Sequence, residues 1–207
     1  MTMNRYWMFA LAIAGAIGSN TALPAGSAQA GAAKAVVCQA CHGPTGNSVN
    51  PEWPSLAGLG ADYIAGQLQQ FRQGKRQNPI MMPLAVSLSS QDMADLGAYF
   101  GSLVNTGAAT GEGDRASREA GEKLYRGGDA THGVPACTGC HGPAGYGNEP
   151  ARFPALRGQQ AAYVVKQLND YAAGARPGGP GGIMHTIAER LSADDIRELA
   201  AYVHELR

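Results

Sequence analysis

Apolar residues recur every three or four positions in one middle segment of each half of the chain, which predicts two amphipathic helices. The members of the two stripes are Ile64, Leu68 and Phe71, and then Val164, Leu168 and Tyr171. A glycine follows each stripe, Gly74 in the first half and Gly174 in the second, as expected where a helix ends. Each segment is therefore predicted to be a helix that buries one face.

A further helix is predicted at the end of each half. Ser89-x-x-Asp92 and Ser192-x-x-Asp195 resemble capping boxes, which open helices. Apolar stripes follow at helical spacing: Met93, Leu96, Phe100 and Leu103, and then Ile196, Leu199, Val203 and Leu206. The intervening loops are rich in proline and glycine, and no useful alternating strand pattern occurs. The pattern predicts an all-α fold.

The second half of the chain repeats the first with a shift of 99 to 103 residues. Matched pairs include Cys38 and Cys137, Tyr63 and Tyr163, Gln67 and Gln167, Arg76 and Arg176, and Met81 and Met184. A repeat this long indicates a duplicated domain rather than a solenoid. We predict a first domain at 31–104, a linker at 105–117 and a second domain at 118–207. The linker sequence, NTGAATGEGDRAS, has no apolar period.

Residues 1–30 have the pattern of a secretory signal. Arg5 precedes an apolar stretch from Tyr6 to Ile17, and small residues then lead to Ala28-Gln29-Ala30. We expect cleavage after Ala30 and a mature protein in the periplasm. The alternative is an uncleaved N-terminal anchor, although the apolar stretch is shorter than the about 20 residues of a membrane span.

Charge and domain size narrow the class of protein. Removing residues 1–30 takes away Arg5 and no acidic residue, which leaves 15 basic against 16 acidic residues. A chain with this balance lacks the basic surface that a nucleic-acid partner requires. Each domain is also small enough to need a disulfide, a metal or a cofactor to complete its core.

All four cysteines lie in two C-x-x-C-H motifs, Cys38 to His42 and Cys137 to His141. This motif is the signature of covalent c-type haem attachment. On a helical turn its three side chains project from one side, so two thiols can bond the porphyrin vinyl groups while the histidine reaches the iron. We predict two haem c groups, attached through Cys38, Cys41, Cys137 and Cys140. A zinc site or a redox-active cysteine pair is the alternative, but neither needs the histidine.

A second axial ligand decides between electron transfer and ligand binding at a haem iron. Only four methionines follow residue 30: Met81, Met82, Met93 and Met184. Met184 lies eight residues before Ser192, and Met81 lies eight residues before Ser89. The repeat therefore selects Met81 and Met184 as the ligands opposite His42 and His141. Met82 is predicted to pack in a loop and Met93 to lie in the core.

Two prolines and the other histidines are further candidates for roles near the haems. An axial histidine needs an acceptor for its second ring nitrogen, and the carbonyl groups of Pro54 and Pro154 are candidates, unless these prolines only shape the turn. His185, beside Met184, is a rival axial ligand or an exposed loop residue. His204 is predicted to face solvent, and His132 has no assigned role. Four repeated tyrosines are predicted to pack in the core, with an interface role as the alternative: Tyr63, Tyr99, Tyr163 and Tyr202.

The sequence resembles the dihaem cytochromes c4, two-domain class I c-type cytochromes of the bacterial periplasm. The resemblance covers nearly all of the chain after residue 30, including VCQACHGPTGNS, MMPLAVSLSSQDMADLGAYF and PACTGCHGPAGYGNEPARFPALRGQQAAYVVKQL. It implies two cytochrome c domains with pseudo-twofold packing and the axial ligands named above. It also implies electron delivery towards terminal oxidases and loose attachment to the inner membrane. One departure is the short segment from Gly31 to Cys38, which leaves little first helix in the first copy.

The predicted function is one-electron transfer without a transformed substrate. The expected partners are an upstream donor and a membrane-bound oxidase. A cytochrome subunit of a larger dehydrogenase, for example one that oxidises a sulfur compound, has the same haem chemistry and remains an alternative. A dihaem peroxidase is a weaker alternative, because it needs an open coordination position and a methionine is placed in both copies.

Overall fold

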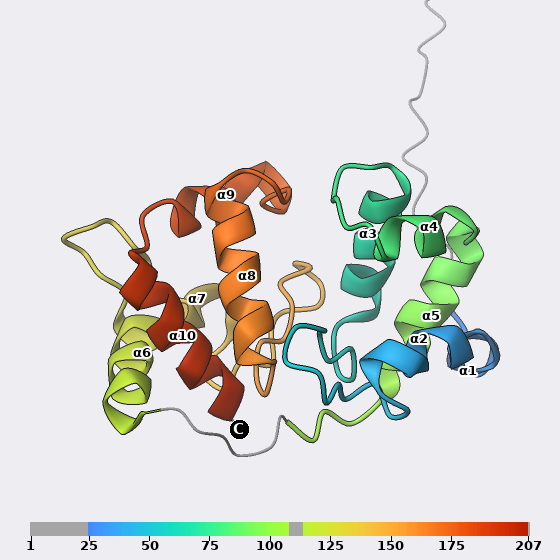
Figure 1. Ribbon diagram of the computed structural model, residues 1–207, viewed down its shortest axis with the longest axis horizontal. Coiled ribbons are helices and arrows are strands. Elements are labelled where there is room, and N and C mark those ends of the chain that lie inside the picture. The colour runs from blue at the N-terminus through green and yellow to red at the C-terminus, as the bar shows by residue number, and fades with distance from the viewer. Residues whose placement is uncertain (1–24, 108–113, 207) are drawn as a thin grey trace, which may run out of the picture.

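The computed structural model describes residues 25–107 and 114–206, which form two helical domains side by side (Figure 1). The first domain contains α1 (Ala28–Lys34), α2 (Val36–His42), α3 (Ala61–Arg72), α4 (Met81–Val86) and α5 (Ser90–Ser102). The second contains α6 (Arg115–Gly127), α7 (Thr138–His141), α8 (Ala161–Ala172), η1 (Pro180–Gly182), α9 (Ile183–Ala188) and α10 (Ala193–Glu205). Among these residues the only β-structure is two isolated bridges. The all-α, two-domain prediction is confirmed.

The last helix of each domain carries the predicted cap and the predicted buried stripe. Ser89 and Asp92 form a capping box at the start of α5, and Ser192 and Asp195 form one at the start of α10. The stripes are almost fully buried, with side chains from Met93, Leu96 and Phe100 in one domain and Ile196, Leu199 and Val203 in the other. Helices α5 and α10 therefore contribute much of the hydrophobic core of their domains.

The first helix of each domain crosses the last helix at close range, because a glycine lies at the contact. A Cβ atom added to Gly31 would overlap the Asp95 carbonyl oxygen, and one added to Gly121 would overlap the Glu198 carbonyl oxygen. Only a residue without a side chain lets the two backbones approach this closely. The crossing of α1 on α5 is thus repeated by α6 on α10.

We predict that Gly121→Ala destabilises the second domain by about 3 kcal/mol, because the added methyl group forces α6 away from α10. Gly127→Ala on the same helix is the matched control, since no atom lies within 4 Å of its Cβ position. Urea unfolding measures the free energy of unfolding of both variants. Equal midpoints for the two variants would contradict the close crossing.

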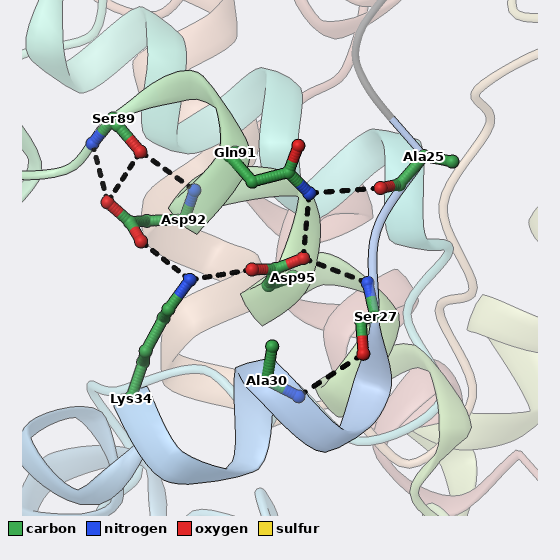
Figure 2. Close-up of polar contacts among 8 residues, drawn as sticks. All are labelled: Ala25, Ser27, Ala30, Lys34, Ser89, Gln91, Asp92 and Asp95. Carbon is green, nitrogen blue, oxygen red and sulfur yellow. Dashed lines mark hydrogen bonds and ion pairs between the residues drawn. The ribbon is translucent and has the colours of Figure 1, made fainter.

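Helix α1 differs from the sequence expectation. It begins at Ala28, with Ser27 as its N-cap, and packs on α5, so the expectation of little first helix in the first copy is wrong. The Ser27 side chain accepts a hydrogen bond from Ala30 N, and Ser27 N donates to Asp95 Oδ1 at 2.9 Å (Figure 2). The first domain thus starts before the predicted boundary at residue 31, and α6 likewise begins at Arg115, inside the predicted linker.

An ion-pair cluster fastens α1 to α5 (Figure 2). Lys34 Nζ lies 2.6 Å from Asp92 Oδ1 and 2.6 Å from Asp95 Oδ2. The Lys34 ammonium, with donors from Ser27 and Gln91, holds the pKa of Asp95 at about 2. The pKa of Asp92 also lies well below its usual value, through Lys34 first and then Ser89. Both carboxylates therefore stay ionised at neutral pH and keep Lys34 in place.

The two domains meet where α3 faces α8 (Figure 1). Gln159 makes two hydrogen bonds to the Ser55 backbone, accepting from N at 2.8 Å and donating to O at 2.9 Å. Gln160 Nε2 donates to Ser48 O, and Glu149 Oε1 accepts from Ala61 N at the start of α3. A carboxylate suits that end of a helix because the unpaired N–H groups there carry partial positive charge. Side chains of the second domain therefore bind the backbone of the first domain through hydrogen bonds.

A second set of interface contacts is reciprocal. Arg76 Nη2 donates to Tyr163 Oη at 2.9 Å, and Arg176 Nη2 donates to Tyr63 Oη at 2.7 Å. The rings of Tyr63 and Tyr163 thus do more than fill a core: their hydroxyl groups bind the opposite domain, which was the alternative that the sequence left open.

No helix in the described part of the chain is long and apolar enough to cross a membrane.

Candidate haem-binding sites

Each C-x-x-C-H motif forms a short helical turn. In the first domain it occupies the end of α2, and in the second Cys137 is the N-cap of α7, which ends at His141. The four cysteines are half-buried and none is in a disulfide. Cys38 and Cys137 each pack against the hydrophobic core of their domain. Burial raises the pKa of the Cys137 thiol to about 11, so this thiol is protonated at neutral pH.

The two motif histidines are buried, each 7% exposed, and each is bonded to a proline carbonyl. His42 Nδ1 lies 2.8 Å from Pro54 O, and His141 Nδ1 lies 2.9 Å from Pro154 O. A carbonyl oxygen can only accept, so Nδ1 carries the proton and Nε2 keeps a free lone pair. Burial lowers the pKa of both imidazoles, although the carbonyl contact acts in the opposite direction. Both rings are therefore neutral and prepared to bind a metal through Nε2.

A left-handed glycine turns the chain back after each histidine. Gly43 has φ 86° and Gly142 has φ 78°. A Cβ atom at Gly43 would overlap Asn47 O, so the turn needs glycine there. The loop that leaves this turn returns to the histidine at Pro54 or Pro154. The repeated glycine and the repeated proline thus build the same acceptor in both domains.

The candidate methionines lie at the beginning of corresponding helices. Met81 is the first residue of α4, and its N–H donates to Asn78 Oδ1 at 2.9 Å. Met184 is the second residue of α9, and its N–H donates to Gly178 O at 2.9 Å. Both side chains are half-buried, and so is that of Met82. Met93 is fully buried in α5, as predicted.

The remaining histidines have protein partners. His185 lies in α9 rather than in a loop, and its Nδ1 donates to Tyr171 O at 2.7 Å. His204 does not simply face solvent, because its Nδ1 contacts Gln159 O at 3.0 Å. This contact links α10 to Gln159, whose side chain bonds Ser55 across the domain interface. His132 is bonded to Asp129 at 2.5 Å on the surface. Sequence reasoning missed the role of His204.

The donor set fits haem c better than zinc. Each domain offers two half-buried thiols, one buried imidazole with a free Nε2 and at least one half-buried thioether, which are the attachment groups and axial ligands of a c-type haem. Across residues 25–107 and 114–206 no three His, Cys, Asp or Glu side chains gather as they would for a zinc ion. Arg176 Nε is also buried without a partner, which leaves a donor available to an anionic group.

Two small all-helical domains, each with a C-x-x-C-H turn and a proline-bonded histidine, define a two-domain c-type cytochrome. The family model described as cytochrome c matches residues 28–103 and 118–207. The chain is 46% identical to cytochrome c4 of Azotobacter vinelandii over 192 residues, covering 88% of this chain and 90% of the relative. The chain belongs to the cytochrome c4 family. It is an electron carrier with two covalently attached haem c groups.

Two other comparisons bear on shape and partners. A crystal structure of reduced recombinant cytochrome c4 from Pseudomonas stutzeri superposes with a TM-score of 0.82 at 44% identity, covering 88% of this chain and 100% of that one. A thiosulfate dehydrogenase electron acceptor from Thiomonas intermedia is 38% identical over 172 residues, covering 82% of this chain and 78% of the relative. The similarity thus extends to a relative that is named as the electron acceptor of a thiosulfate dehydrogenase.

Proposed function

We propose that Cys38 and Cys41 attach the first haem and Cys137 and Cys140 the second, with His42 and Met81 as axial ligands of one iron and His141 and Met184 of the other. When bound, each haem supplies an iron that takes up and releases one electron. The observation that carries the proposal is the paired contact of His42 with Pro54 and His141 with Pro154, which fixes both rings with Nε2 free.

The chain contributes rigidity and exclusion of other ligands. The proline carbonyls keep each imidazole in one tautomer and one orientation, so the ring does not rearrange when an electron arrives. Met81 and Met184 would each hold the iron of their haem as a second protein ligand and would thereby exclude small molecules. Thioether sulfur favours ferrous iron and raises the reduction potential.

Absorption spectra of the two redox states test this ligand set. We expect low-spin haem in both domains, with the weak far-red band of methionine-ligated ferric haem. A high-spin resting spectrum, or fewer than two haems per chain, would argue against the assignment.

We further propose that the protein carries electrons from a respiratory donor to a membrane-bound terminal oxidase, with loose association at the inner membrane. The second candidate is electron acceptance from a sulfur-compound dehydrogenase, favoured by the similarity to the thiosulfate dehydrogenase electron acceptor. Stopped-flow reduction separates the two. Rapid reduction by a quinol-oxidising complex supports the first function, and rapid reduction by a thiosulfate dehydrogenase supports the second.

We infer that the protein is exported to the periplasm and that the signal is removed before Ser27 rather than after Ala30. A cut after Ala30 would remove the N-cap of α1 and the Ser27 N–H that bonds Asp95 (Figure 2). Small residues suited to signal cleavage also occur earlier, at Ala22, Ala25 and Gly26.

N-terminal sequencing of the protein from the periplasm tests the cleavage position. We predict a first residue no later than Ser27, and an intact mass that includes Ala28, Gln29 and Ala30. A mature chain beginning at Gly31 would contradict this cleavage position, because it would lack both the N-cap and the first three residues of α1.

A further inference from the structure

The turn that follows each motif histidine is held differently in the two domains. In the first domain Gly43 is pressed against the next part of the loop, since a Cβ atom at Gly43 would overlap Asn47 O. Asn47 is itself fixed by the end of the domain, because its side chain donates to Val104 O at 3.0 Å and accepts from Thr106 N at 3.0 Å. Close packing therefore holds the first turn.

The second turn lacks this packing. Apart from its neighbours in the chain, a Cβ atom at Gly142 would find its nearest atoms only at 4.0 Å. With the repeat shift of 99 residues, Tyr146 stands where Asn47 does, and its side chain is 70% exposed. Packing alone therefore does not fix the second turn.

A tyrosine on α6 makes a contact that can hold the second turn. Tyr125 Oη donates to Gly142 O at 2.7 Å. Its ring is fully buried and belongs to the core cluster against which Cys137 packs. Burial raises the pKa of the Tyr125 phenol, so the hydroxyl keeps its proton at neutral pH and stays a donor. The residue next to His141 thus has a buried hydrogen-bond donor on its carbonyl group.

The first domain has an alanine in the place of this tyrosine. Gly31 and Gly121 mark the same helix crossing in the two domains. Four residues after these glycines stand Ala35 in the first domain and Tyr125 in the second. Both side chains are fully buried, but an alanine has no group to donate. The hydroxyl contact is therefore a property of the second domain.

A second tyrosine in the same core does not duplicate the contact. Tyr202 lies beside Tyr125, with ring centres 5.3 Å apart. Its counterpart Tyr99 accepts a hydrogen bond from Gln39, inside the first motif, at 2.9 Å. Thr138 stands in the place of Gln39, and Tyr202 Oη is buried without a hydrogen-bond partner among the described residues. Of these two packed tyrosines, Tyr125 is the one bonded to the turn.

We propose that Tyr125 is a positioning residue for His141, the axial ligand of the second iron, and that the first haem site is built without such a residue. The proposal rests on the haem ligands given under Proposed function. Fixing the Gly142 carbonyl restrains the turn that carries His141, so the imidazole keeps one orientation. The hydroxyl also directs the positive end of its dipole at that carbonyl oxygen. Its removal leaves a partial negative charge uncompensated beside the ligand, which favours ferric iron and lowers the reduction potential.

Tyr125→Phe in the holoprotein tests the proposal. Proton NMR of the ferric protein measures the haem methyl shifts, which depend on the orientation of the axial imidazole, and redox titration measures both potentials. We expect the methyl shifts of the second haem to move and its potential to fall, while the first haem keeps its values. Tyr202→Phe is the matched control, because it removes a hydroxyl from the same core without breaking a hydrogen bond. It is expected to leave both haems unchanged.

Urea unfolding of the same variants separates positioning from a purely structural role. A Tyr125→Phe variant with a lower midpoint but wild-type methyl shifts and potentials would overturn the proposal, and so would equal changes at both haems. If this variant fails to fold, the wild-type protein still gives a test. Its Tyr125 hydroxyl proton is expected to exchange slowly with solvent, and fast exchange would overturn the proposal. A wild-type protein without two low-spin haems would overturn the proposed function instead.

Discussion

Replacing Met184 with alanine is expected to open the sixth coordination position of the second haem and lower its reduction potential by on the order of 0.1 V, a fraction of the about 0.8 V that axial ligands span. The thioether is lost and no other methionine lies on α9. His185, its neighbour, is engaged with Tyr171 O through Nδ1. Redox titration measures the potential, and carbon monoxide binding to the ferrous protein reports the open position.

The first domain offers an internal control for this result. Met81 and Met82 are adjacent in α4 and both are half-buried, so burial does not distinguish them. We expect Met81→Ala to behave as Met184→Ala does, and Met82→Ala to retain the low-spin spectrum and the wild-type potential. If Met82→Ala opened the iron and Met81→Ala did not, the alignment of the two copies would have selected the wrong residue.

Replacing Cys137 and Cys140 together with alanine is expected to leave one covalent haem per chain and to unfold the second domain. Cys137 packs against the core formed by Leu124, Tyr125 and their neighbours, and that core is small. Without a covalently bound porphyrin, little apolar area remains to offset the loss of chain entropy. Haem content by the pyridine haemochrome assay and protection of α10 from hydrogen exchange measure the effect.

The control for this variant lies inside the same motif. Thr138→Ala changes a residue between the two cysteines and is expected to keep both haems. The first domain should lose protection in its Ser48 and Ser55 loop in the cysteine variant, because Gln159 and Gln160 no longer hold it. Full protection of α10 with a single haem would contradict the view that the cofactor completes the core.

Periodicity and the internal repeat predict the helices that bury a stripe. The stripes of α5 and α10 and their serine-aspartate caps could be predicted because capping and burial are local or periodic features. The contacts of His42 and His141 with proline carbonyls were also predictable, since a proline follows each motif histidine at nearly the same spacing, 12 residues in one copy and 13 in the other. What repeats in the sequence repeats in the structure.

Features that depend on contacts across the chain were missed. Helix α1 was not expected, because its small residues follow an apolar stretch and read as the end of a signal, whereas its stability comes from Asp95 and the close crossing on α5. The arginine pair was visible as repeated residues, Arg76 and Arg176, but nothing local shows that each binds the opposite domain. Only the packed interface gives these residues a role.

The exchange of contacts between Arg76 with Tyr163 and Arg176 with Tyr63 has the form of an isologous interface, in which each partner offers the same surface to the other. Such an interface between separate subunits dissociates on dilution. Here both surfaces belong to one polypeptide, so the effective concentration of each for the other stays high, about millimolar for two surfaces joined by a short segment of chain. The pairing of the two redox centres is therefore independent of how much protein the cell makes.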